Sequence, residues 1–166
     1  MECVISIARP NQSEAISALV QASFLEFVAP DWDPNARETF LKESSPQDLE
    51  AGIANGEFAA AAQLDDQLVG FVLLPSPEIL GMLFVHPNHV GHGIGGALWQ
   101  AAKQHLNIRH PALEAIELNS SPYAVPAYSA LGFRAISEPF WKSGCLATRM
   151  AYQLQTAPRN GGAHVA

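Results

Sequence analysis

The chain has 166 residues, 48% of them apolar and 15% charged, and its formal net charge at pH 7 is −7. This length and composition predict one globular domain with a hydrophobic core and exclude a disordered protein. The negative charge argues against nucleic acid as the main partner, because phosphate backbones are bound by basic surfaces.

The first third of the chain predicts one short strand and three helices. Residues 4–8 form an apolar run that is typical of a strand. Ser13, Asp33 and Ser45 are each suited to cap a helix, and the last two are followed directly by proline, which is favoured at a first helical position. We therefore expect helices over residues 13–29, 33–41 and 45–55.

The rest of the chain predicts a hairpin and then strands that alternate with helices. Two apolar runs, 58–64 and 68–74, are joined by Asp65-Asp66-Gln67, and Asp favours tight turns. The later elements are expected in this order: strand 79–85, a helix ending near 107, strand 112–118, helix 125–131, and strands 134–137 and 146–154. Residues 156–166 are typical of a mobile tail, which leaves a single domain over residues 1–155.

The most informative stretch runs from Leu83 to Leu98. Apolar residues up to Val85 predict a strand, glycines at positions 91, 93, 95 and 96 predict a loop, and the residues that follow predict a helix. Glycine lets the backbone come close to a ligand. The first amides of a helix have no partner within it and carry the positive end of its dipole. This order of elements is therefore suited to bind a phosphate or pyrophosphate.

Two kinds of phosphate-binding loop fit this stretch to different degrees. Gly91, Gly93 and Gly96 satisfy the dinucleotide pattern G-x-G-x-x-G, but five residues separate them from Val85, whereas that motif begins almost at the strand end. The stretch also resembles motif A of the GNAT superfamily of acyl-CoA N-acyltransferases, which runs apolar-x-Val-x-Pro, a spacer, then Gln/Arg-x-x-Gly-x-Gly/Ala. The matching residues are Leu83, Val85, Pro87, Gly93 and Gly95, and Val90 departs from the pattern at the Gln/Arg position.

A second motif supports the same family. Asn119 follows a predicted strand, and Tyr128 stands four residues before Gly132-Phe133. This resembles motif B of the GNAT superfamily, in which an Asn precedes a short helix that carries a Tyr at this spacing. Two motifs in the right order are more specific than either alone. The resemblance implies an α/β fold of the GNAT type, with a central twisted mixed sheet of about seven strands and about four flanking helices.

The resemblance also implies a function and a set of residues. The implied protein is an N-acetyltransferase that moves an acetyl group from acetyl-CoA to a primary amine of a small molecule or peptide, by direct attack in a ternary complex. Tyr128 would be the general acid that protonates the leaving thiolate. The implied cofactor contacts are backbone groups of Leu83, Phe84 and Val85 for pantetheine, the loop amides of Gly91, His92, Gly93, Ile94, Gly95 and Gly96 for pyrophosphate, and Asn119 for the cofactor arm.

The general base and the acceptor pocket are less well defined. Many relatives carry a base on the strand before the glycine loop, and the nearest carboxylate here is Glu78, one residue before the usual position, where Ile79 stands. A one-residue shift turns a side chain to the other face of a strand unless a bulge intervenes, so deprotonation through ordered water is an equally good account. In the family, the segment between the first two helices and the final hairpin line the acceptor pocket, which implies Phe27, Trp32, Phe140 and Trp141, with Glu26, Asp31 and Asp33 as possible partners of an ammonium group.

No metal and no membrane are expected. His86, His89 and His92 have the spacing H-x2-H-x2-H, but no cysteine or fitting carboxylate is near them, and a structural zinc site usually needs four ligands. No apolar run approaches the roughly 18 residues of a membrane span. The start lacks the pattern of a signal peptide, and the two cysteines form no C-x-x-C pair. A cytoplasmic protein is therefore expected, with a homodimer left open.

Two other functions remain as alternatives. One is a non-catalytic sensor that binds acyl-CoA. The other is a dinucleotide-binding oxidoreductase, supported by G-x-G-x-x-G and by Glu117, which lies near the distance expected for a ribose contact. The distance from strand to glycine and the motif around Tyr128 argue against the oxidoreductase, and Tyr128 argues against the sensor.

Overall fold

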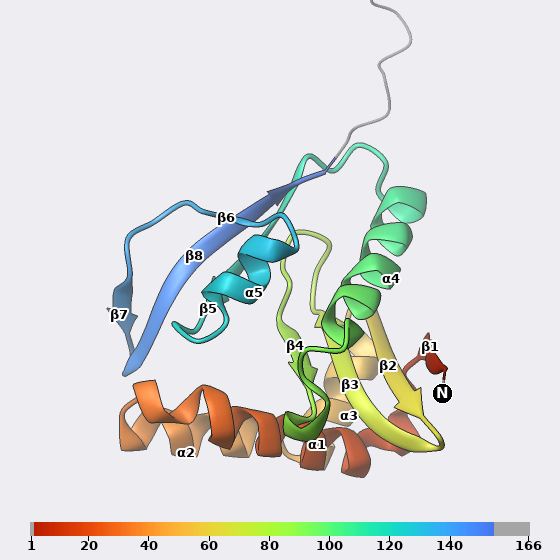
Figure 1. The fold of residues 1–166 in the computed structure, drawn as a ribbon, viewed down its shortest axis with the longest axis horizontal. Helices are drawn as coiled ribbons and strands as arrows, with labels where there is room; N and C mark the ends of the chain where they lie inside the picture. Colours follow the sequence, from red (N-terminus) through yellow and green to blue (C-terminus); the bar gives the residue numbers. More distant parts are fainter. Residues whose placement is uncertain (1, 155–166) are drawn as a thin grey trace, which may run out of the picture.

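The computed structural model describes residues 2–154, which form eight strands and five α-helices. The first sheet is antiparallel, in the order β1 (Cys3–Ile7), β2 (Phe58–Leu64), β3 (Gln67–Leu74) and β4 (Met82–Val85). In the second, β8 (Cys145–Gln153) pairs with β5 (Ala115–Ser120), β6 (Arg134–Ala135) and β7 (Phe140–Lys142). The helices are α1 (Ser13–Phe27), α2 (Pro34–Glu43), α3 (Pro46–Asn55), α4 (Ile94–Arg109) and α5 (Val125–Ala130) (Figure 1).

A short parallel contact joins the two sheets, and the strands then separate. The amide of Leu80 donates to Glu117 O at 2.9 Å, and the amide of Glu117 donates to Glu78 O at 2.8 Å. Beyond this contact, within residues 2–154, β4 pairs only with β3 and β5 pairs only with β8. One edge of β4 therefore carries backbone groups that no strand uses.

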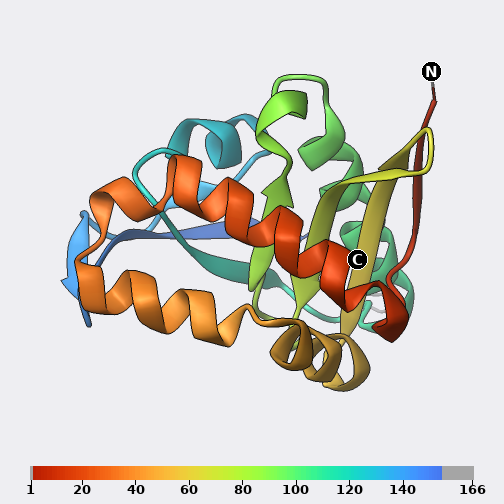
Figure 2. The same ribbon diagram turned by 90° about the horizontal axis from the view of Figure 1, so that it is seen from below.

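Helices cover the first sheet from both sides. Figure 2 shows α1, α2 and α3 gathered on one side of the molecule, and α4 contacts β2, β3 and β4 from the other side. The core is divided accordingly, with Phe71 packed on the side of α1 and Trp99, a residue of α4, packed on the other. The alanine run of β2 belongs to both parts, because Ala59 and Ala61 are in the first cluster and Ala60 and Ala62 are in the second. Small side chains there let α4 approach β2 closely.

The predicted fold class is confirmed, and most predicted elements are present. Capping is as expected at two helices, because Asp33 Oδ1 accepts from the Ala36 amide at 2.8 Å and Ser45 Oγ accepts from the Asp48 amide at 3.2 Å. Ser13 is the first helical residue of α1, so the prediction that it caps this helix is wrong. The predicted tail, residues 156–166, lies outside the described residues.

Two strand predictions need correction. A single strand is predicted over residues 79–85, but β4 begins at Met82, and Ile79 forms isolated bridges to Ser76 and Glu117. The second difference is β7, which is not predicted, has only three residues and follows Pro139. Short strands of this kind carry too few residues for an alternating pattern to be seen.

Glu57, just before β2, links the first sheet to the end of α4. Its Oε1 lies 2.8 Å from His105 Nε2 and 2.6 Å from His110 Nε2. The hydrogen bond from His105, followed by the one from His110, lowers the pKa of the Glu57 carboxyl below its usual 4.5. A lowered pKa means that the folded state favours the ionised form, so this stabilisation is present above pH 4.5 and is lost as the pH falls further.

We expect Glu57→Gln to lower the free energy of unfolding by about 1 to 2 kcal/mol at neutral pH, because it removes a charged acceptor shared by two histidines. The difference from wild type should shrink as the pH falls below 4.5, where the wild-type carboxyl also loses its charge. Urea unfolding at several pH values measures both effects. Glu38→Gln is the control, because Glu38 forms an exposed ion pair with Lys42, and it should change stability by less than about 0.5 kcal/mol.

Gly70 of β3 sets how closely α4 approaches the sheet. A Cβ atom at this position would lie 2.8 Å from Leu98 Cδ1 and 2.9 Å from Ile94 Cγ2, both on α4. Gly70→Val should therefore lower the free energy of unfolding by about 1 to 3 kcal/mol through overpacking. Gly52→Ala is the matched control in α3, where a Cβ would make an ordinary 3.4 Å contact, and it should be neutral or stabilising. Thermal unfolding measures the stability of both variants. A Gly70→Val protein more stable than the Gly52→Ala protein would contradict this account.

Candidate active site

The loop between β4 and α4 presents a row of backbone amides. A short 3₁₀ helix, Pro87–His89, follows β4, and α4 begins at Ile94. Gly91 and Gly93 have φ angles of +83° and +80°, a conformation that favours glycine. Within residues 2–154, none of the amides from 91 to 96 donates a hydrogen bond to another protein group. Unpaired amides at a helix N-terminus form a site for an anion such as pyrophosphate.

A β-bulge at the start of β4 decides which backbone groups face the gap between the sheets. Gly81 donates its amide to Leu73 O at 2.9 Å, while Met82 is the register partner of Leu73, so two residues lie opposite one. The amide of His86 donates to Val69 O at 2.8 Å. Because pairing alternates along an antiparallel strand, the backbone groups of Leu83 and Val85 point away from β3, whereas those of Phe84 point toward it.

Tyr128 lies on α5, next to the start of α4. A Cβ atom at Gly96 would lie 3.6 Å from Leu131 Cδ2, which shows how near the two helices come. The Tyr128 ring packs edge-on against Phe133, with ring centroids 5.6 Å apart. Burial raises the pKa of the Tyr128 hydroxyl far above its usual range, so the phenol stays protonated and can donate a proton.

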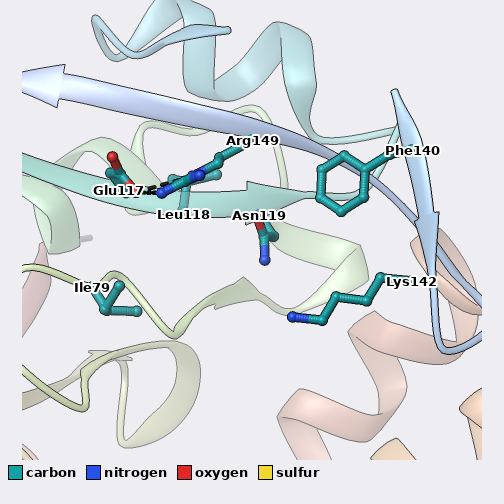
Figure 3. Close-up of a pocket in the computed structure, with 7 residues that line it drawn as sticks. All are labelled: Ile79, Glu117, Leu118, Asn119, Phe140, Lys142 and Arg149. Atoms are coloured by element: carbon teal, nitrogen blue, oxygen red, sulfur yellow. Dashed lines mark hydrogen bonds and ion pairs between the residues drawn. The ribbon is translucent and has the colours of Figure 1, made fainter. Parts of the chain in front are cut away.

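Two adjoining hollows are lined mainly by residues of β5, β7 and β8. The larger has a volume of about 430 Å³ and is shown in Figure 3; the smaller has a volume of about 360 Å³. They share Asn119, Phe140 and Lys142. The larger hollow is also lined by Ile79, Glu117, Leu118 and Arg149, and the smaller by Trp32, Ser121, Ser143, Cys145, Leu146 and Ala147.

Charged and tightly packed contacts fix the walls of these hollows. Arg149 donates from Nη2 and Nε to Glu117 Oε2 at 2.6 and 3.1 Å. At the other end, the amide of Asp33 donates to Gly144 O at 3.0 Å, and a Cβ at Gly144 would collide with the Asp33 carboxylate. This contact holds the turn between β7 and β8 against the start of α2.

Trp32 lines a hollow, as predicted for the acceptor site, whereas Phe27 and Trp141 do not. Trp32 lines the smaller hollow. Phe27, at the end of α1, stacks on Tyr123 in the loop after β5, with centroids 4.4 Å apart and planes at 12°. Trp141 is 63% exposed and lines neither hollow.

Glu78 is not in either hollow. Its side chain is exposed, its carbonyl accepts the Glu117 amide, and the neighbouring Ile79 lines the larger hollow instead. Sequence analysis missed Lys142 and Arg149 as lining residues. The alternation along β8 could have indicated Arg149, an exposed residue between the buried Thr148 and Met150, whereas Lys142 depended on the undetected β7.

Comparisons with known proteins agree with this geometry. A family model described as an acetyltransferase (GNAT) domain matches residues 28–154. The peptidyl-lysine N-acetyltransferase YiaC of Escherichia coli (strain K12) is 30% identical over 103 residues, which is 62% of this chain and 67% of that protein.

Solved structures share the fold at lower sequence identity. A GCN5-related N-acetyltransferase from Rhodopseudomonas palustris has a TM-score of 0.80 and 22% identity, with 93% of this chain and 97% of that chain covered. The PaiA N-acetyltransferase from Thermoplasma acidophilum, solved in complex with coenzyme A, has a TM-score of 0.77 and 16% identity, with 92% and 99% covered.

A strand pair that separates, with a loop of free amides leading into a helix, is the arrangement expected of an acyl-CoA-dependent transferase. The chain belongs to the GNAT family of N-acetyltransferases. Membership of this family gives acetyl-CoA as the cosubstrate. The oxidoreductase alternative is therefore set aside, and Glu117, its suggested ribose contact, is paired with Arg149.

Among residues 2–154, no group of three or more His, Cys, Asp and Glu side chains is arranged to hold a metal ion. His86 instead accepts the Asn88 amide at its Nδ1, at 3.1 Å. Within the same residues, no helix is long and apolar enough to cross a membrane.

We expect Gly93→Asp to weaken acetyl-CoA binding by more than about tenfold, because it places a negative charge beside the loop amides. Gly93→Asn is the matched control, since Asn has nearly the same size and both residues tolerate the left-handed conformation of Gly93. A Cβ at Gly93 meets nothing within 4 Å, so both variants should fold. Calorimetric titration with acetyl-CoA measures the affinities, and equal affinities for the two variants would show that the loop does not hold the pyrophosphate.

Proposed function

We propose that the protein transfers an acetyl group from acetyl-CoA to a primary amine of a small molecule or peptide, by direct attack in a ternary complex. The observation that carries this mechanism is the position of Tyr128 on α5, the short helix whose C-cap residue, Leu131, lies beside Gly96 in the first turn of α4. A proton donor at this place can serve the thiolate that leaves when the amide bond forms.

The cofactor would lie along the edge of β4 and over the glycine loop. The amides of residues 91–96 are free to bind the pyrophosphate, and the outward-pointing backbone groups of Leu83 and Val85 are free to bind the pantetheine arm. Asn119 is exposed on β5, across the gap from β4, where it can contact the arm or the acceptor.

The chemistry requires a neutral amine, a thioester carbonyl and one proton donor. The amine nitrogen forms a bond to the acetyl carbon, the carbon–sulfur bond breaks, and the sulfur takes the proton of Tyr128. Because Glu78 lines neither hollow, we propose that the amine loses its own proton to water rather than to this carboxylate.

Cys145 lines the smaller hollow but fits no role as a covalent nucleophile. Burial raises the pKa of its thiol, and the negative charges of Asp33 and Glu43 raise it further. A protonated thiol is a poor nucleophile, and this supports direct transfer without an acetylated enzyme. The E. coli relative is named for peptidyl-lysine, which makes a lysine side chain one acceptor to include in any test.

We expect Tyr128→Phe to lower kcat by about 100-fold while leaving acetyl-CoA affinity nearly unchanged, because general acid catalysis contributes about 10²- to 10⁴-fold and water can substitute in part. The ring and its packing against Phe133 are kept. Because the pKa of Tyr128 is raised, wild-type kcat should not fall through loss of this proton as the pH rises to its ordinary value of 10.0. Steady-state thiol release with saturating acetyl-CoA, over a range of pH, measures both.

Tyr123→Phe is the control for this experiment. It also removes one hydroxyl, and it keeps the ring that stacks on Phe27. Its kcat should stay within about twofold of wild type, as expected for a hydroxyl outside the reaction. Equal turnover for wild type and Tyr128→Phe, with chemistry shown to be rate-limiting, would remove Tyr128 from the mechanism.

A further inference from the structure

The larger hollow carries a positive charge that is unusual for this chain. The protein has 16 acidic and 9 basic residues, not counting histidine. The charged side chains of the larger hollow are nevertheless two cations, Lys142 and Arg149, and one anion, Glu117. The wall of the hollow therefore has the opposite sign to the protein as a whole.

Only part of this charge is balanced. Arg149 is paired with Glu117 through two hydrogen bonds to one carboxylate oxygen. Lys142, in contrast, has no carboxylate within 4 Å among residues 2–154. Figure 3 shows its side chain extending from β7 into the hollow, on the side where the Asn119 amide points. Lys142 is thus a cation without a partner at the boundary between the two hollows.

We propose that the acceptor amine carries a carboxylate a few bonds away, and that Lys142 binds this carboxylate with the Asn119 amide as a second donor. This inference rests on the proposed function, since it names the acceptor of the same reaction. A charge-assisted hydrogen bond is the strong kind of polar contact, and a carboxylate is the simplest anion an amine substrate can carry. Ile79 and Phe140 supply apolar walls for the carbon chain between the two groups.

Size and charge both fit this class of acceptor. A volume of about 430 Å³ lies within the range of about 300 to 1,000 Å³ that is typical of small-molecule sites. Lys142 would repel a second ammonium group, so the same side chain disfavours diamines. The carboxylate could belong to a free amino acid or to an acidic side chain beside a target lysine, and the experiment separates these sources.

The test compares acceptors that differ only in charge. We expect wild-type kcat/KM, counted per neutral amine, to be on the order of 10- to 100-fold higher for 6-aminohexanoate than for its carboxamide. Lys142→Gln should remove most of this preference, and Lys142→Glu should reverse it. Lys42→Gln is the matched control, because Lys42 is exposed on α2 and lines neither hollow. A lysine peptide with a neighbouring Glu, compared with the same peptide carrying Gln, tests the second source.

Binding provides a readout that does not depend on turnover. Calorimetric titration of the coenzyme A complex with 6-aminohexanoate and its carboxamide should show tighter binding of the acid to wild type, and equal binding of both to Lys142→Gln. The proposal is overturned if wild type shows no preference, in binding or in acetylation, for a carboxylate-bearing acceptor over its neutral partner. This applies to both the amino acid and the peptide pair. Acetylation of all amines without regard to the carboxylate would overturn it too, but would leave the proposed function in place.

Discussion

The separation of β4 from β5 is the constraint on which the rest of the structure depends. Two hydrogen bonds between residues 78–80 and Glu117 hold the strands in parallel contact, and at the start of β4 Gly81 and Met82 both lie opposite Leu73. After this point a sheet would normally continue its ladder of hydrogen bonds. Here the edge groups of Leu83 and Val85 have no strand partner, which is costly unless water or a ligand supplies one. Binding of an extended arm with amide groups would complete the sheet.

The two sides of this gap are held by different kinds of contact. On the cofactor side, close approach is made possible by a missing side chain, since Gly70 admits α4 onto β3. On the acceptor side, polar and turn contacts dominate, with Arg149 fixed to Glu117 and the turn at Gly144 fixed to Asp33. The first side is therefore suited to hold one ligand in one geometry, and the second presents side chains that select what may enter.

Much of the cofactor side could be predicted from the sequence, because glycines and a Tyr at fixed spacing are local features. The helix start at Ile94, the glycine conformations and the position of Tyr128 on α5 all follow from residues close together in the chain. Which edge of β4 each residue faces could not be predicted, because it depends on the bulge at Gly81. The acceptor side could not be predicted either, because Lys142 and Arg149 line the same hollow only as a result of the pairing of β5, β7 and β8.

One face of the strand β5 borders the hydrophobic core, and the other borders the larger hollow. Ile116 and Ser120 are buried and do not line the larger hollow, while Glu117 and Asn119 line it from the other face. Side chains alternate along a strand, so an insertion or deletion of one residue would exchange these two faces, placing a carboxylate in the core and isoleucine in the hollow. Over evolutionary time this segment is therefore free to change its chemistry by substitution on the hollow face, but its length is fixed.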